Sequence, residues 1–165
     1  MKIEHSFSVD FPPDKVAEVL CSEEYNLETE RRREGVVSTS FEMVEDGPGG
    51  KVFRLLTEEY SRTRTGGLDR SKTVKTIIEH RYDPSDWTLR WLYKKGSGSP
   101  SKLHLAGTYT LRAAAGGTKV THEVEIEVKI PLVGGSIARL IAGEFKKELP
   151  VREGILRSHL ERGAG

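Results

Sequence analysis

The sequence predicts an α+β fold, in which an antiparallel sheet of six to seven strands is covered by a long C-terminal helix. Between residues 36 and 130, apolar and polar residues alternate in consecutive segments separated by short turns, as in an antiparallel meander. The stretch 128–149 then changes from strand-like alternation to helical spacing at the segment Pro-Leu-Val-Gly-Gly, 131–135. The helix that follows is the only segment long enough to cover such a sheet.

The N-terminal part predicts one strand and two short helices. Residues 2–11 alternate like a half-buried strand. Pro13 suits the first residue of a helix that ends near Leu20. Ser22 can cap a second short helix. The arginine run 31–33 at its end is interpreted as a complement to the helix dipole and as solvated surface charge.

Six further strands are expected over residues 36–44, 51–60, 72–82, 87–95, 102–113 and 118–130. Turns are expected at 46–50 and 96–100, and a long exposed loop at 61–71. The strand 118–130 alternates most clearly, and its glutamates are expected to face solvent at Glu123, Glu125 and Glu127.

The C-terminal helix is expected to begin near Val133. Its apolar face is predicted to comprise Val133, Ile137, Leu140, Ile141, Phe145 and Leu149. Pro150 removes one backbone hydrogen bond, so we expect a kink there, or a break followed by a second short helix ending near Leu160.

Length and composition restrict the functional classes. A chain of 165 residues suggests a single domain, 1–165. The net charge of +1 argues against a dedicated nucleic-acid binder, which would be strongly basic. No apolar run reaches the roughly 20 residues of a membrane span, so no stable membrane insertion is expected. The single cysteine, Cys21, permits no intrachain disulfide, which fits a cytoplasmic protein.

The sequence contains no recognisable catalytic or metal-binding spacing. The serines of the segment GSGSP, 96–100, are misplaced for a nucleophile elbow. The five histidines lie far apart in the sequence and no cysteine cluster accompanies them, so neither a metal nor another cofactor is expected. Cys21 is expected to be a small core residue.

Three short motifs carry a family resemblance: Gly-Thr-x-x-Leu at 107–111, Gly-Thr at 117–118 and Pro-Leu-Val-Gly-Gly at 131–135. With the order of elements along the whole chain, they resemble the START-like superfamily, also called the polyketide cyclase/lipid-transport or birch-pollen-allergen superfamily. The likeness is closest over 106–149, to an uncharacterised bacterial branch. The resemblance implies a helix-grip fold, in which a curved sheet grips the C-terminal helix and an apolar cavity lies between them.

Polar residues on otherwise apolar strand faces are the candidate anchors for a ligand. Arg54, His80 and His122 each share a face with apolar residues, and a buried polar group needs a partner. Each either pairs with a neighbour or points into a cavity, where it would hold a polar ligand group. The aromatic residues on these faces can be either core or cavity lining. The expected ligand-binding residues are Arg54, His80, Trp91, Leu105, Tyr109, His122, Val124, Ile126, Ile137 and Ile141.

Three functional hypotheses follow. The first is a non-catalytic module that binds a small hydrophobic or amphipathic ligand, such as a lipid, fatty acid or polyketide-like compound. The second is a cyclase/aromatase-type enzyme in the same fold, with His80, Tyr109 or His122 as acid or base. The third is an interaction module that uses the apolar helix face. It ranks lowest because the sheet needs that face. The oligomeric state is left open.

Overall fold

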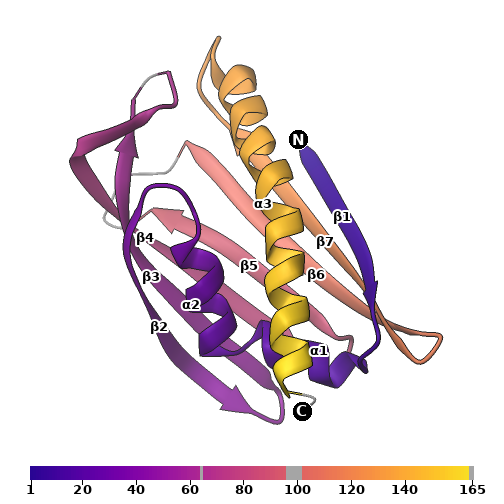
Figure 1. Ribbon diagram of the computed structural model, residues 1–165. Helices are drawn as coiled ribbons and strands as arrows, with labels where there is room; N and C mark the ends of the chain where they lie inside the picture. The colour runs from indigo at the N-terminus through magenta and orange to yellow at the C-terminus, as the bar shows by residue number, and fades with distance from the viewer. Residues whose placement is uncertain (64, 96–101, 164–165) are drawn as a thin grey trace.

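The computed structural model describes residues 1–63, 65–95 and 102–163 (Figure 1). Its elements, in chain order, are β1 (Lys2–Val9), α1 (Pro13–Leu20), α2 (Glu23–Arg31), β2 (Val36–Gly47), β3 (Gly50–Arg62), β4 (Leu68–Asp83), β5 (Thr88–Lys95), β6 (Leu103–Ala114), β7 (Gly117–Val128) and α3 (Gly134–Gly163). The turn expected at 96–100 lies outside the described residues.

The seven strands form one antiparallel sheet with the order β1-β7-β6-β5-β4-β3-β2. Strands β2 to β7 follow one another as a meander. Strand β1 instead pairs with β7, from Lys2 opposite Glu125 to Val9 opposite Thr118. The two short helices therefore carry the chain from one edge of the sheet to the other. The predicted α+β, helix-grip architecture is confirmed.

All three helices cover the same face of the sheet, here called the inner face (Figure 1). Helix α3 packs against β7 and β1, while α1 and α2 pack against α3 and the sheet. Two small residues of α3, Ala138 and Ala142, are buried at this contact. Small side chains allow a helix to approach a sheet closely, so this half of the inner face is filled.

The alternation expected in β7 is confirmed. Val120, Val124 and Ile126 are fully buried on the inner face. Glu123, Glu125 and Glu127 are exposed on the opposite, outer face. Cys21 is buried, as expected for a core residue.

The face predicted for β3 was wrong. Phe53 and Leu55 are buried on the inner face, and Arg54 lies on the outer face, where its Nε donates a hydrogen bond of 3.1 Å to Glu79. The segment offers apolar residues on both faces, since Val52 and Leu56 alternate with Phe53 and Leu55. With Phe53 and Leu55 on the inner face, the Arg54 guanidinium stays in contact with water and with the Glu79 carboxylate. This arrangement avoids the cost of burying a charge.

The long loop expected at 61–71 was also wrong. Strand β3 continues to Arg62 and β4 begins at Leu68, so the two strands form a tight hairpin. The backbone N–H of Thr63 donates to the carbonyl of Gly67 at 2.8 Å. An irregularity in register follows Tyr60, which accommodates the extra polar residues within β4.

Helix α3 begins next to the expected residue and runs without a break through Pro150. The carbonyl that Pro150 leaves without a helical donor belongs to Lys146, on the exposed side of the helix, where water can donate to it. Two members of the predicted apolar face, Val133 and Leu140, are 48% and 47% exposed. Of the two expected alternatives at Pro150, a kink or a break, the break was wrong. The placement of Val133 and Leu140 on the buried face was also wrong.

The join between β7 and α3 depends on Gly134. A Cβ atom at this position would lie 2.3 Å from the carbonyl oxygen of Val128. Only glycine therefore allows the chain to fold back so tightly over the end of its own strand.

A second close approach lies in the middle of the inner face. Gly107 of β6 stands opposite Trp91 of β5, and the indole ring lies directly over it. A Cβ atom on residue 107 would come within 2.3 Å of two indole atoms. The absence of a side chain at Gly107 thus sets the position of Trp91.

We expect Gly107→Ala to lower the free energy of unfolding by about 1–3 kcal/mol, because the new methyl group would overpack the indole. The measurement is urea denaturation followed by tryptophan fluorescence. Gly143→Ala is the matched control: it lies in α3 with no atom near the added methyl group. It should raise stability by roughly 0.5–1 kcal/mol through helix propensity. Equal stability of Gly107→Ala and the wild type would contradict the packing described for Trp91.

Candidate functional site

A cavity of about 170 Å³ lies between the inner face of the sheet, α2 and α3. Its walls come from strands β3 to β6 and not from β7, where α3 packs directly on the sheet. The residues that line it are Leu20, Tyr25, Asn26, Glu30, Arg33, Leu55, Glu59, Arg62, Ile78, His80, Leu89, Trp91, Tyr93, Leu103, Leu105, Tyr109, Ile141, Glu144, Phe145, Glu148 and Arg152.

Aliphatic and aromatic side chains form a large part of the cavity wall. Leu55 and Ile78 stand opposite each other on β3 and β4. Trp91 extends this surface, and its ring stacks on Phe145 of α3 with a centroid distance of 6.2 Å. An apolar molecule placed here would be removed from water on both the sheet side and the helix side.

One part of the polar wall is a buried ion-pair network. The Glu30 side chain of α2 is 1% exposed and accepts hydrogen bonds from Arg33 Nε at 3.1 Å and from Thr57 Oγ1 at 3.1 Å. Arg33 also donates to Glu59 at 2.7 Å. The Tyr93 hydroxyl donates to the other oxygen of Glu59 at 3.4 Å. These bonds tie the end of α2 to strands β3 and β5.

The charges of this network stabilise one another. Burial by itself would raise the pKa of Glu30, but the adjacent guanidinium of Arg33 lowers that pKa below its ordinary value overall. Burial likewise disfavours the charged form of Arg33, and Glu30 and Glu59 reverse this, so the pKa of Arg33 is raised. Both groups are therefore ionised at neutral pH. The interpretation of the arginine run as solvated charge was wrong for Arg33.

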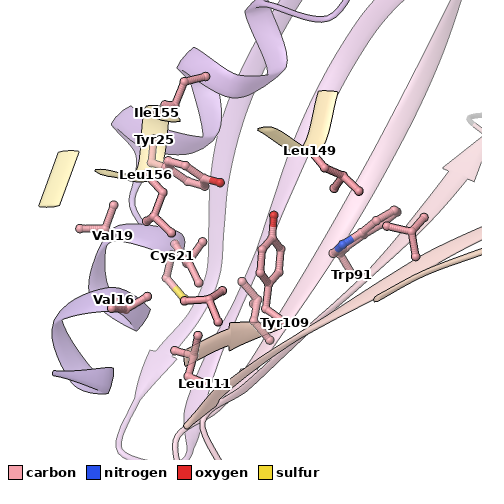
Figure 2. Packing of buried hydrophobic residues seen from close by; sticks show 14 of the residues in the cluster. Val16, Val19, Cys21, Tyr25, Trp91, Tyr109, Leu111, Leu149, Ile155 and Leu156 are labelled. Carbon is pink, nitrogen blue, oxygen red and sulfur yellow. The ribbon is translucent and has the colours of Figure 1, made fainter. Parts of the chain in front are cut away.

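A second polar group of the wall surrounds Arg152 of α3. The continuity of α3 through Pro150 places Arg152 on the same helix face as Phe145 and Glu148. The tyrosines Tyr25 of α2 and Tyr109 of β6 point their hydroxyl groups toward each other (Figure 2). Both tyrosines lie within electrostatic range of the Arg152 guanidinium.

His80 lies on the same side of the cavity. Its ring stacks on Phe53 at a centroid distance of 4.4 Å and is 7% exposed. Burial, reinforced by the positive charge of Arg152, lowers the pKa of His80 to about 4. The ring is therefore neutral at pH 7. Its Nδ1 atom is buried and has no hydrogen-bond partner among the described residues.

His122 lies next to the cavity without lining it. Its Nε2 accepts a hydrogen bond of 3.0 Å from the indole N–H of Trp91, and its ring stacks on Tyr109 at 3.8 Å. An indole N–H can only donate, so Nε2 carries no proton. Burial is the main cause that lowers the pKa of His122 well below its ordinary value. His122 is a neutral packing partner of Trp91 and Tyr109.

The structure brings together five of the ten expected site residues in the cavity wall: His80, Trp91, Leu105, Tyr109 and Ile141. The other five lie elsewhere. Arg54 is on the outer face; His122, Val124 and Ile126 lie on β7, away from the cavity wall; Ile137 is half-buried on α3 outside the lining. The family resemblance implies a cavity between the sheet and the C-terminal helix. Because α3 packs directly on β7, the cavity lies instead between the helix and strands β3–β6.

Sequence reasoning missed Glu30, Arg33, Glu59 and Arg152. The buried face of α2 consists of Tyr25, Asn26, Thr29 and Glu30, which have helical spacing but are mostly polar. A search for apolar periodicity therefore passes over them. Arg152 was missed because the expected break at Pro150 disconnected it from Ile141 and Phe145, whose face it continues.

The cavity lining reaches the surface where the β3–β4 hairpin meets α3, since the side chains of Arg62 and Glu144 are 40% and 43% exposed; this end is here called the mouth. Arg62 and Glu144, which both line the cavity, form an ion pair of 3.2 Å across this point. A Cβ atom added to Gly66 would lie 2.2 Å from Leu140, so the hairpin tip also touches α3.

The described residues contain neither a metal cluster nor a membrane span. No group of three or more histidine, cysteine, aspartate or glutamate side chains among them is arranged to hold a metal ion. No described helix combines the length and the apolar character needed to cross a membrane.

A family model described as "Protein of unknown function (DUF2505)" matches residues 70–158, more than half of the chain. The chain belongs to this family. The matched part of this DUF2505 protein runs from β4 into α3 and contains His80, Trp91, Tyr109 and Arg152. It does not include Glu30 and Arg33. A search of curated proteins finds no match to the chain.

Solved structures show the START-like fold over almost the whole length of the DUF2505 protein. The protein TTHA0849 from Thermus thermophilus is 16% identical with a TM-score of 0.65, covering 100% of both chains. The Zhui aromatase/cyclase from Streptomyces sp. R1128 is 16% identical with a TM-score of 0.61, covering 100% of this chain and 96% of its own. A START superfamily protein from Mycobacterium smegmatis is 13% identical with a TM-score of 0.58, covering 98% and 97%. These likenesses establish the fold.

The ion-pair network predicts a specific stability pattern. Arg33→Met should lower the free energy of unfolding at pH 7 by about 3–5 kcal/mol, because it leaves the buried Glu30 carboxylate without its counter-ion. The double variant Glu30→Gln/Arg33→Met should recover part of this loss. Arg32→Met, which removes an exposed arginine of the same run, should change stability by less than about 0.5 kcal/mol. Urea denaturation measures all four proteins.

The same network predicts a pH dependence. The pKa of Glu30 is lower in the folded protein than in the unfolded chain, where it is about 4.3. The contribution of ionised Glu30 to the free energy of unfolding is therefore fully present above the unfolded pKa. It is lost as the pH falls through the folded pKa. The stability difference between the wild type and Arg33→Met should shrink in this acid range. A difference that stays constant from pH 7 to pH 3 would contradict the assignment.

Proposed function

We propose that the protein binds a small hydrophobic or amphipathic ligand in the cavity without catalysing its conversion. The observation that carries this proposal is the composition of the cavity wall. Apolar side chains such as Leu55, Ile78 and Leu105 cover the sheet side, and Ile141 and Phe145 cover the helix side. Seven charged side chains also line the cavity, together with the unpartnered Nδ1 of His80, so the wall joins an apolar surface to a polar one. Apolar walls with a few polar anchors are typical of ligand sites.

The volume of this partly open cavity indicates the size of the ligand part that it can surround. The cavity holds about 170 Å³. An engineered apolar cavity of about 150 Å³ is known to bind benzene, so this space suits a body the size of one aromatic ring or a short branched chain. A longer lipid-like tail would have to extend through the mouth between Arg62 and Glu144, which would require that ion pair to separate.

A cyclase/aromatase-type enzyme is the alternative. It is supported by three structural neighbours, one aromatase/cyclase and two di-domain ARO/CYC proteins, and by the presence of His80 and Tyr109 in the cavity wall. The protonation state of the histidines weighs against it. His80, with a pKa near 4, is neutral at pH 7 and has no proton to spare as an imidazolium acid. His122, the third candidate for acid or base, does not line the cavity. Binding is therefore the preferred function.

The proposal extends to partners and location. We expect no nucleic-acid partner, since the net charge is +1. The sequence has one cysteine, Cys21, so it forms no intrachain disulfide, which supports a cytoplasmic location. An interaction module that works through the apolar face of α3 is disfavoured, because Ala138, Ala142 and Leu149 of that helix are buried.

Organic extraction of the purified protein, followed by mass spectrometry, tests the proposal directly. A small apolar or amphipathic compound at near-stoichiometric amount supports it. Incubation of the protein with that compound, followed by product analysis, separates binding from turnover. Recovery of a chemically altered compound would favour the enzyme.

Filling the cavity should remove binding without unfolding the protein. Ile141→Trp places a larger side chain in the cavity wall, so an apolar fluorescent probe should bind at least tenfold more weakly. Val151→Trp, on the exposed side of the same helix, is the control and should bind the probe like the wild type. Fluorescence titration measures affinity, and circular dichroism checks that both variants are folded. Unchanged probe binding by folded Ile141→Trp would place the probe outside this cavity.

A further inference from the structure

We propose that Arg152 anchors a carboxylate on the ligand, so that the cavity selects compact acids consisting of one negatively charged head and a ring-sized apolar body. This inference rests on the proposed function and adds the chemical class of the ligand. It follows from the state of the three arginines in the cavity wall, from the hydroxyl groups beside Arg152, and from the size of the cavity.

Two of the three cavity arginines already have carboxylate partners at hydrogen-bonding distance. Arg33 is bound by Glu30 and by Glu59, the latter at 2.7 Å. Arg62 pairs with Glu144 at 3.2 Å and donates to the carbonyl of Gly66 at 2.9 Å. Neither has a free guanidinium edge of the kind that binds a carboxylate through two parallel hydrogen bonds.

Arg152 is different. Its nearest carboxylate is that of Glu148, at 3.7 Å, which is too long for a hydrogen bond. Among the described residues its guanidinium makes no hydrogen bond, although it carries five N–H donors and its side chain is only 21% exposed. Burial disfavours the charged form of Arg152, but nearby groups outweigh this and raise its pKa, so it stays charged. Its N–H donors are then available for charge-assisted hydrogen bonds to an anionic ligand group.

Glu148 does not replace such a ligand. Burial raises the pKa of Glu148 above its ordinary value, an effect larger than the opposing influence of Arg152. The carboxyl group of Glu148 therefore holds its proton more readily than the carboxyl group of an exposed glutamate does. A ligand carboxylate with an ordinary acid strength would therefore be the better partner for Arg152.

The hydroxyl groups beside Arg152 supply further donors. Tyr25 and Tyr109 each carry one O–H proton, and their hydroxyl groups point toward each other in the cavity wall (Figure 2). At least one of these two protons makes no hydrogen bond among the described residues and needs an acceptor. A carboxylate oxygen held by Arg152 would provide it. The buried Nδ1 of His80, also without a partner, lies in the same wall.

A positively charged head group would be poorly accommodated. It would face Arg152 directly, and like charges repel each other strongly in a site with little water. The buried carboxylate of Glu30 and that of Glu59 are already neutralised by Arg33. The arrangement therefore favours an anion over a cation, and a neutral amide would lose the charge-assisted bonds to the guanidinium.

The test compares two probes of the same shape, phenylacetate and phenylacetamide, at pH 7 with the full chain. Isothermal titration calorimetry measures their affinities for the wild type, Arg152→Met, Arg152→Lys and Arg139→Met. Met keeps much of the volume of the arginine stem without the charge. Lys keeps the charge without the planar fork. Arg139, exposed on the same helix, is the matched control.

We expect the wild type and Arg139→Met to bind phenylacetate at least tenfold more tightly than phenylacetamide. Arg152→Met should lose this preference while it still binds the amide, and Arg152→Lys should keep part of it. Equal affinity of the wild type for both probes would overturn the inference alone, because binding in the cavity would remain. A preference that persists in Arg152→Met would also overturn it. Binding of neither probe, together with a failure of the apolar fluorescent probe, would overturn the proposed function as well.

Discussion

The structure depends on how one helix covers the inner face of a seven-stranded sheet. Helix α3 lies close to β7 and β1 because Ala138 and Ala142 present almost no side chain at that contact. The same helix presents Ile141 and Phe145 toward β3–β6. There the side chains of the sheet and those of the helix leave a space between them. Close packing on one half and incomplete packing on the other leave a cavity at a defined place. The position of the cavity is therefore a consequence of which residues on α3 are small.

The buried charges at the cavity have a structural explanation before a functional one. Arg33 follows α2, which has a weakly apolar inner face, and its bonds to Glu30 and Glu59 attach that region to β3. A buried ion pair contributes little net stability compared with apolar packing, but breaking it is costly. The network thus favours one arrangement of α2 on the sheet. That arrangement brings Tyr25 against Tyr109 and so builds the polar part of the wall. Arg152, which has an ion-pair contact with Glu148 at 3.7 Å but no hydrogen bond among the described residues, is the group whose presence the fold alone does not explain.

The sequence predicts the fold well where one pattern dominates and the site poorly where two patterns compete. Strand β7 has a single apolar face, so its inward and outward residues follow from alternation alone, and the switch at 131–135 marks the start of α3 to within one residue. Strand β3 carries apolar residues on both faces, and only the pairing of Arg54 with Glu79 on the neighbouring strand decides between them. Pro150 suggests a break by local rules, whereas packing of the residues on either side keeps α3 continuous. The continuous helix places Arg152 in the cavity wall. A prediction of a break at Pro150 therefore gives no reason to include Arg152 in the site.

The histidines show why the cavity suits binding better than acid–base chemistry. A general acid or base needs a pKa near the working pH and access to the reacting group. His122 has neither, since it is enclosed by Trp91 and Tyr109 and its Nε2 lone pair is occupied. The contact instead fixes Trp91 over Gly107 and Tyr109 toward Tyr25, so one neutral imidazole orients two residues of the cavity wall. His80 reaches the cavity, but burial and the charge of Arg152 keep it neutral. A neutral imidazole beside a permanent cation and tyrosine hydroxyls can donate hydrogen bonds without exchanging protons, which holds a polar head in place and leaves the ligand unchanged.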